Sequence, residues 1–226
     1  MITRIKVIAS LIILCPVLVG LAGCAPASTQ PVEQPTVQST PPAVTSAAGL
    51  PSGWETYTGQ GQCSYAISHP SDIDVTSQGT YNVLLSPTST EPSGPVPSFI
   101  YISVIPDDIQ NVEPGSIYNY DPAETQTLLS MQPGESKSLR DDPNLAPSFT
   151  YTRLPDTMLS NQTAQTYENT QPWEFPPGTK EIRYYLKANG CTYLIGGYLA
   201  GVDSGGPMGI DEETFDQIIN TFRIAP

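Results

Sequence analysis

The chain has 226 residues, and its 22 acidic against nine basic side chains give a formal net charge of −13 at pH 7. Two of the basic residues, Arg4 and Lys6, lie in a segment that we expect to be removed, which leaves seven cations against 22 anions and a net charge of −15. Nucleic-acid binding by phosphate neutralisation needs a basic face, and attachment to anionic lipids needs a polybasic segment. The charge excludes the first function and argues against the second.

The first 24 residues have the pattern of a secretory signal. Two cations precede an apolar stretch at residues 7–21, which has about 15 residues and is too short for a membrane-spanning helix of about 20. The stretch ends in Leu21, Ala22, Gly23 and Cys24, which resemble the lipobox of bacterial lipoproteins at all four positions.

This resemblance implies lipid attachment at Cys24. In that family a diacylglyceryl thioether forms on the cysteine thiol, and a signal peptidase then removes the leader, here residues 1–23 with Cys15. Two or three acyl chains hold a protein firmly, so we expect a protein anchored through fatty acids, such as palmitate, to the extracytoplasmic face of the cell membrane. The alternative is a hydrophobic leader with a cysteine of no special role.

Residues 24–50 are expected to form a disordered tether. After Cys24, residues 25–50 contain five Pro, seven Ser or Thr, one charged residue and no aromatic residue. Such a segment buries too little apolar surface to offset the cost of ordering. It would span about 28 Å as a random coil and about 80 Å as polyproline. A spacer that holds a domain away from the membrane and a linker without a length requirement both remain open.

Residues 51–226 form one predicted domain, because all 12 Tyr, both Trp and all five Phe lie there. Short β-rich runs are separated by turns, and residues 180–187 and 191–200 form the clearest hairpin. The other predicted strands are residues 54–58, 62–68, 81–86, 98–105, 136–140, 148–154 and 158–167.

Two short helices complete the domain. Asp121 is a predicted N-cap, followed by Pro122 and, three positions after the cap, Glu124. Asp211 caps the second helix, whose apolar residues fall on one stripe at Phe215, Ile218, Ile219 and Phe222. Strands with two short helices predict an α+β domain, an antiparallel β-sheet flanked by helices.

Two segments resemble PsbP-like domains of bacterial lipoproteins. Residues 63–72 resemble a strand of the type aromatic-x-Ile-x-Tyr-Pro followed by a Ser/Asp turn, with His69 in place of the Tyr, and residues 215–222 resemble the closing helix. The family has a Trp after the turn, where this chain has Ile73. The resemblance implies a PsbP-like fold and a protein that binds or stabilises rather than catalyses, although function transfers poorly along a fold.

The two cysteines of the domain are expected to form a disulfide. Cys63 and Cys191 each begin a Cys-x-Tyr-x-Ile pattern, which places each cysteine on the core-facing side of a strand. Disulfides persist outside the cytoplasm, and closing a span of 128 residues would contribute about 5 kcal/mol in the chain-entropy model. Two buried free thiols, or a reactive or metal-binding pair, remain alternatives.

No cofactor or resident metal is expected. The chain has one His, which excludes an ordinary zinc site, and it lacks a phosphate-binding Gly loop or a dinucleotide fingerprint. Four acidic clusters could hold Ca²⁺ or be solvated loop acids: Asp72/Asp74, Asp107/Asp108, Asp141/Asp142 and Asp211/Glu212/Glu213.

The function expected from these features is that of a non-catalytic binding or accessory module, whose ligand is a protein, a small molecule or a carbohydrate. Trp173 and Phe175 lie in a predicted loop. They either form an exposed contact patch or cover the core.

A serine hydrolase is the alternative function. Residues 203–207, Asp-Ser-Gly-Gly-Pro, resemble the nucleophile loop of trypsin-like proteases, and His69, Asp108 and Ser204 follow the order of that family's triad. Against this, Val202 replaces the family's Gly, the His setting differs, and only 22 residues follow Ser204. Asp-Ser-Gly-Gly-Pro is also ordinary turn chemistry.

We therefore expect a fluorophosphonate probe not to label Ser204 in the folded protein. Because a surface turn needs no particular hydroxyl, Ser204→Ala should change the free energy of unfolding by less than about 0.5 kcal/mol. Stoichiometric labelling of Ser204 that is lost in His69→Ala would instead make the protein a hydrolase.

Overall fold

The structure is a computed structural model that describes residues 50–88, 99–108, 120–140, 142–173, 175–199 and 210–225. The predicted leader, tether, Cys24 and Ser204 lie outside these residues. The described part contains strands β1 (Trp54–Gly59), β2 (Tyr65–Pro70), β3 (Ile73–Gln78), β4 (Asn82–Pro87), β5 (Ile100–Pro106), β6 (Ser136–Ser138), β7 (Thr150–Arg153), β8 (Thr157–Leu159), β9 (Gln162–Asn169), β10 (Lys180–Ala188), β11 (Cys191–Leu199) and β12 (Arg223–Ile224), and helices α1 (Pro122–Leu129) and α2 (Glu212–Ile219).

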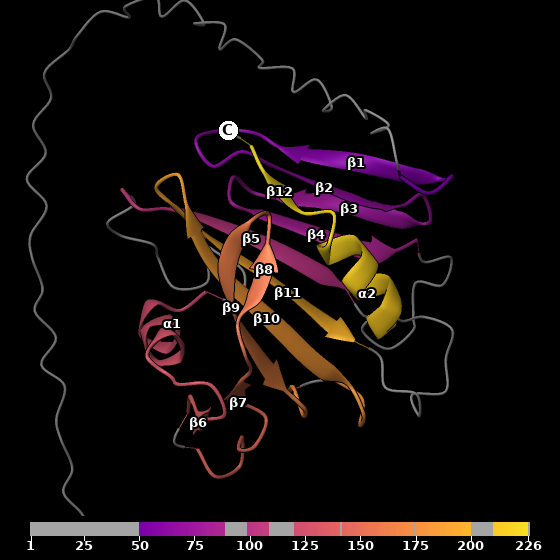
Figure 1. The fold of residues 1–226 in the computed structure, drawn as a ribbon. Helices are drawn as coiled ribbons and strands as arrows, with labels where there is room; N and C mark the ends of the chain where they lie inside the picture. The colour runs from indigo at the N-terminus through magenta and orange to yellow at the C-terminus, as the bar shows by residue number, and fades with distance from the viewer. Residues whose placement is uncertain are drawn as a thin grey trace, which may run out of the picture. The chain divides into compact units, whose positions relative to one another are not determined.

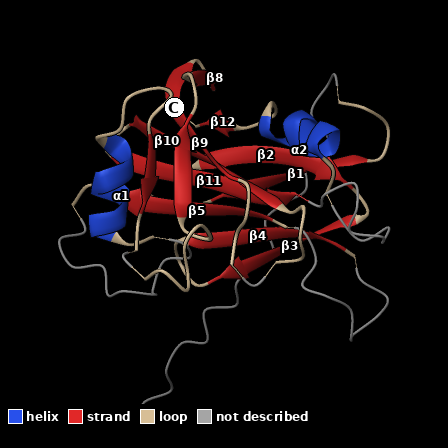
Figure 2. Ribbon diagram, turned by 90° about the horizontal axis from the view of Figure 1, so that it is seen from below, coloured by secondary structure: helices blue, strands red, loops and turns tan. Residues whose placement is uncertain are grey.

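The strands form two antiparallel sheets (Figure 1). The larger sheet has nine strands in the order β3-β4-β5-β11-β10-β9-β7-β6, with β8 paired to β9. The smaller sheet has three strands in the order β1-β2-β12. An α+β domain whose antiparallel sheet is flanked by two short helices is therefore confirmed (Figure 2).

Both faces of the larger sheet are buried. On β10, Ile182, Tyr184 and Leu186 point into one apolar cluster, which also contains side chains of β2 and α2; we call this side the first face. Tyr185 points into the other cluster, which contains side chains of α1; this is the second face. Because both sides are covered, β5 and β11 are buried at every position, and they alternate between two apolar environments rather than between core and water.

Two glycines of β11 make room for large rings on opposite faces. A Cβ on Gly196 would overlap the Tyr101 ring on the second face, and a Cβ on Gly197 would overlap the Phe215 ring on the first face. The absence of side chains here lets each ring pack directly on the strand backbone. Helix α2 can therefore lie close to the centre of the sheet.

Both helix starts are confirmed. The Asp121 carboxylate accepts hydrogen bonds from the backbone N–H groups of Ala123 and Glu124 at 2.8 and 2.9 Å. The Asp211 carboxylate accepts from the N–H of Thr214 at 2.7 Å, and this bond lowers the Asp211 pKa. The apolar stripe of α2 faces the core, where Phe215, Ile218, Ile219 and Phe222 are buried.

The predicted strand at residues 158–167 is wrong, because the structure has two strands there. β8 and β9 meet at a turn in which Ser160 and Asn161 have φ values of 50° and 60°. A two-residue hairpin turn needs positive φ at both central positions, and Asn tolerates it well. The sequence analysis also missed β3, an edge strand in which Ile73 is buried but four of the six side chains are exposed, and it began β2 three residues early.

Each of the two helices in the described residues has eight residues. Within this part of the chain, neither has the length or the apolar composition to cross a membrane.

Candidate functional site

The two domain cysteines are bonded to each other. Cys63 and Cys191 form a disulfide with their Cα atoms 5.9 Å apart, which confirms the predicted pairing and leaves neither a free thiol nor a metal-binding pair. The bond joins the segment before β2 of the smaller sheet to the first residue of β11 in the larger sheet. Tyr65 and Tyr193, each two residues after a cysteine, are buried in the same first-face cluster.

The His69 side chain is engaged by its own neighbour. It is buried on β2, and its Nδ1 lies 2.9 Å from the Pro70 carbonyl oxygen. Since a carbonyl only accepts, Nδ1 carries the proton, which in a Ser-His-Asp triad is given to the aspartate. Asp108 lies beyond the end of β5, and no ion pair or hydrogen bond between described residues joins it to His69. The third predicted member, Ser204, lies outside the described residues.

The acidic clusters do not converge in the described part of the chain. There, no group of three or more His, Cys, Asp or Glu side chains could hold a metal ion. Of the Asp211 cluster, Asp211 itself caps α2, as expected for an acid at a helix N-terminus. Asp141 lies outside the described residues.

The two loop aromatics have different roles. Phe175 stacks on Tyr198 of the second face, with ring centroids 4.0 Å apart and planes 8° apart, so it covers the core. Trp173 is 50% exposed, and its ring centroid is 6.4 Å from that of Phe149. Phe175 therefore covers the core, as one alternative predicted, whereas Trp173 is accessible to solvent.

A buried ion pair lies on the second face, and the sequence analysis missed it. The Arg183 Nε donates to Glu181 Oε1 at 2.6 Å, and both side chains are almost inaccessible. The hydroxyls of Tyr101 and Tyr151 donate to the two oxygens of the same carboxylate at 2.7 and 2.6 Å. The Arg183 guanidinium also lies over the Tyr151 ring, 4.6 Å from its centroid. Glu181 is therefore fully hydrogen-bonded, as a buried charge requires.

Burial raises the pKa of the Tyr101 and Tyr151 hydroxyls well above the ordinary tyrosine range. The positive charge of Arg183 opposes this increase, and the negative charge of Glu181 adds to it. Desolvation is the largest single effect on Arg183 and lowers its pKa, but Glu181 together with Tyr101, Tyr151 and Tyr185 raises it, so the net shift is upward. A raised tyrosine pKa stabilises the folded state fully below the unfolded pKa of about 10, and this contribution is lost as the pH rises above it. Tyr101 and Tyr151 therefore stay neutral at physiological pH.

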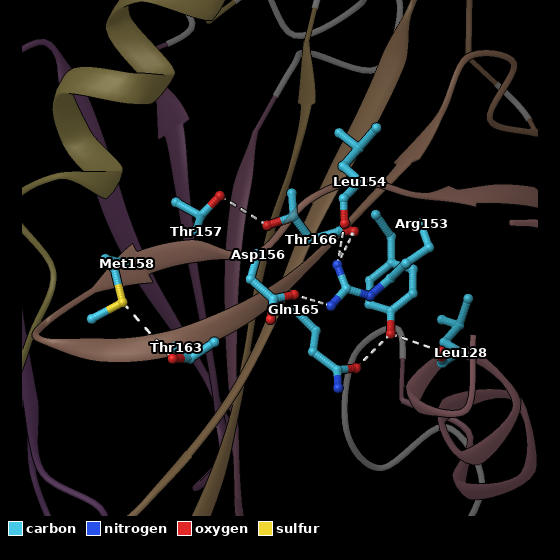
Figure 3. A network of polar contacts seen from close by, with 10 residues as sticks. Leu128, Arg153, Leu154, Asp156, Thr157, Met158, Thr163, Gln165 and Thr166 are labelled. Atoms are coloured by element: carbon cyan, nitrogen blue, oxygen red, sulfur yellow. Dashed lines mark hydrogen bonds and ion pairs between the residues drawn. The ribbon is translucent and has the colours of Figure 1, made fainter. Parts of the chain in front are cut away.

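A second buried cation, Arg153, holds three elements together (Figure 3). Its guanidinium donates to the Asp156 carboxylate and to the backbone carbonyls of Leu154 and Thr166, and it lies 5.1 Å from the Tyr167 ring centroid. The Tyr167 hydroxyl, in turn, donates to the Leu128 carbonyl of α1 at 2.7 Å. This network ties β7 and β9 to α1, and the Arg153 side chain at its centre is only 3% exposed.

An accessible polar pocket lies between the β8–β9 hairpin, the end of α2 and β12. Its volume is about 290 Å³. The lining residues are Met158, Leu159, Ser160, Asn161, Asn220 and Arg223. In contrast to the two buried networks, this pocket presents polar side chains to solvent, and it can therefore receive a ligand.

The buried ion pair carries a signal that sequence reasoning could have used. Glu181 and Arg183 are two residues apart in a strand and so share a face, and they stand beside Ile182, Tyr184, Tyr185 and Leu186, which are apolar or aromatic. The pocket carries no such signal, since Asn161 and Arg223 are 62 positions apart.

The chain has a distant structural likeness to known proteins. No family model and no curated protein sequence matches the chain. A crystal structure of a protein from Bacteroides thetaiotaomicron VPI-5482 is similar over 72% of this chain, with 10% sequence identity and a TM-score of 0.39. The chain spans only 45% of that protein's length, and the likeness is too low to support an inference about function.

Removing the charge of Glu181 should destabilise the domain strongly. Glu181→Gln leaves Arg183 buried without a counter-ion, and breaking a buried pair in this way costs about 3–5 kcal/mol. The double variant Glu181→Gln/Arg183→Met should recover part of this loss, because the unpaired charge is gone. Denaturant unfolding measures both effects.

The matched control is Lys187→Gln, which changes a charge at an exposed position of the same strand. It should alter the free energy of unfolding by less than about 0.5 kcal/mol. A Glu181→Gln protein as stable as the Lys187→Gln protein would contradict the structural role of the ion pair.

Proposed function

We propose that the protein is a lipid-anchored extracytoplasmic lipoprotein that works as a non-catalytic binding or accessory module. The observation that carries the proposal is the Cys63–Cys191 disulfide. Structural disulfides form and persist in oxidising compartments and are rare in the cytosol. The disulfide inside the domain therefore supports an extracytoplasmic location, which the predicted secretory leader and the acylation of Cys24 also imply.

The arrangement of the two PsbP-like segments supports a PsbP-like domain. Residues 63–72 include β2, and residues 215–222 include most of α2. The two segments are in contact through Thr221, which follows α2: the Ser68 backbone N–H donates to the Thr221 hydroxyl at 2.7 Å, and this hydroxyl lies 3.1 Å from the Ser68 carbonyl. Two sequence segments that together mark one fold are expected to pack against each other, as residues 63–72 and 215–222 do.

The chemistry of the domain interior favours binding over catalysis. The Nδ1 of the chain's one histidine, His69, lies within hydrogen-bond distance of the Pro70 carbonyl, so in this structure Pro70, and not Asp108, orients the ring. The buried carboxylate of Glu181 is saturated by Arg183 and two tyrosines. A group that is fully hydrogen-bonded and 1% exposed reaches no substrate.

Metabolic labelling with a fatty acid tests the anchor. Cells that express the wild-type chain should incorporate the label, and Cys24→Ser should abolish incorporation, because the thioether needs a thiol. The leader should also remain uncleaved in that variant, which a mass measurement detects.

Cys15→Ser is the control, since this residue is also a cysteine of the leader region but is removed before the mature protein forms. It should be labelled like the wild type. Label in the Cys24→Ser protein, or its loss in the Cys15→Ser protein, would refute Cys24 as the lipid attachment site.

A further inference from the structure

The polar pocket has a built frame. The β8–β9 turn is tied to β12, because the Ile224 backbone N–H donates to the Ser160 hydroxyl at 2.8 Å. Across the pocket, Arg223 Nη1 donates to the carbonyls of Asn220 and Phe222 at 2.7 and 2.6 Å, which fixes the guanidinium at the end of α2. The walls therefore come from two parts of the chain that are held to each other by hydrogen bonds.

The pocket contains a cation without a carboxylate partner. The structure describes all seven Lys and Arg residues that follow the leader, and five of them form ion pairs. Lys187 and Arg223 are the two for which no described acid is close enough. Although the acidic chain as a whole repels anions, a guanidinium without a described carboxylate partner in a pocket attracts an anion locally.

The remaining donors of Arg223 suit a carboxylate. With Nη1 bound to backbone carbonyls, Nε and Nη2 have no hydrogen-bond partner within the described residues. A guanidinium presents pairs of parallel donors that match the two oxygens of a carboxylate. Because the group is already held in place, less side-chain entropy is lost when it binds.

The other lining residues select for hydroxyl groups and one apolar surface. Asn161 and Asn220 each offer an amide that can donate and accept. Met158, which is 63% exposed, offers an apolar side. The volume of about 290 Å³ is at the lower end of the range for small-molecule pockets, which begins at about 300 Å³, so the pocket suits a small ligand.

We propose that this pocket binds a sugar acid: Arg223 takes the carboxylate, Asn161 and Asn220 take ring hydroxyls, and Met158 packs on the apolar side of the ring. The same chemistry occurs in a free hexuronate and at the end of a polyuronate chain, and an open pocket accepts either. The inference rests on the proposed binding function. The lipid anchor is tested separately by fatty-acid labelling at Cys24, so failure of the labelling test and failure of ligand binding are distinguishable.

Calorimetric titration of the full lipidated chain tests the inference. The protein is kept in a polyoxyethylene detergent, which has no sugar headgroup, and is titrated with galacturonate, with trigalacturonate and with galactose. Binding of galacturonate assigns the site to a free sugar acid, and binding of the trimer alone assigns it to a chain end. Galactose should bind at least about tenfold more weakly, since it lacks the carboxylate. Absence of binding by both acids, or equal binding of galactose, overturns the inference.

Two variants and one control locate the site. Arg223→Gln should weaken binding of the acid at least about tenfold. Asn161→Gly removes the amide at a position with φ of 60°, which glycine adopts without strain, and it should also weaken binding while the protein stays folded. Lys187→Gln removes the other unpaired cation with the same change of net charge and should bind like the wild type. Equal affinity of the Arg223→Gln and Lys187→Gln proteins would overturn the assignment.

Discussion

The Cys63–Cys191 disulfide is the constraint around which the first face of the domain is arranged. It fixes the smaller sheet over the larger one at the start of the central hairpin. Tyr65 and Tyr193 follow the two cysteines at the same spacing, and the Phe222 ring lies 5.6 and 5.8 Å from theirs. The end of α2 is thus packed against aromatic rings that the covalent bond holds in place, and β12, which follows at once, forms one wall of the polar pocket.

The second face is organised by charge rather than by a covalent bond. Glu181 and Arg183 lie beneath aromatic side chains, and Tyr101 and Tyr151 satisfy the carboxylate. Breaking such a pair is costly, although replacing both members by apolar residues often is not. The pair therefore determines which side chains meet on this face, in addition to stabilising the domain. The polar chemistry of the domain is therefore divided: the buried groups hold the two faces together, while the polar pocket that contains Arg223 is open to solvent.

Local signals were sufficient for much of the fold. The caps at Asp121 and Asp211, the β10–β11 hairpin and the paired Cys-x-Tyr-x-Ile patterns were all predicted, since each depends on residues close in sequence or on strand alternation. β3 was missed because its apolar pattern is confined to Ile73 and Val75, and the rest of this edge strand is polar. The pocket could not be predicted, since the positions of Asn161 and Arg223 relative to each other follow only from tertiary packing.

Counting thiols in the intact protein tests the account most directly. The protein is extracted from its native membrane, unfolded in denaturant without reductant, alkylated and analysed by peptide mass. Cys15 leaves with the leader, Cys24 is blocked by the thioether, and Cys63 is bonded to Cys191, so we predict that no cysteine is alkylated and that one peptide pair is joined by a disulfide. Alkylation of Cys63 and Cys191 would contradict a domain built for an oxidising compartment.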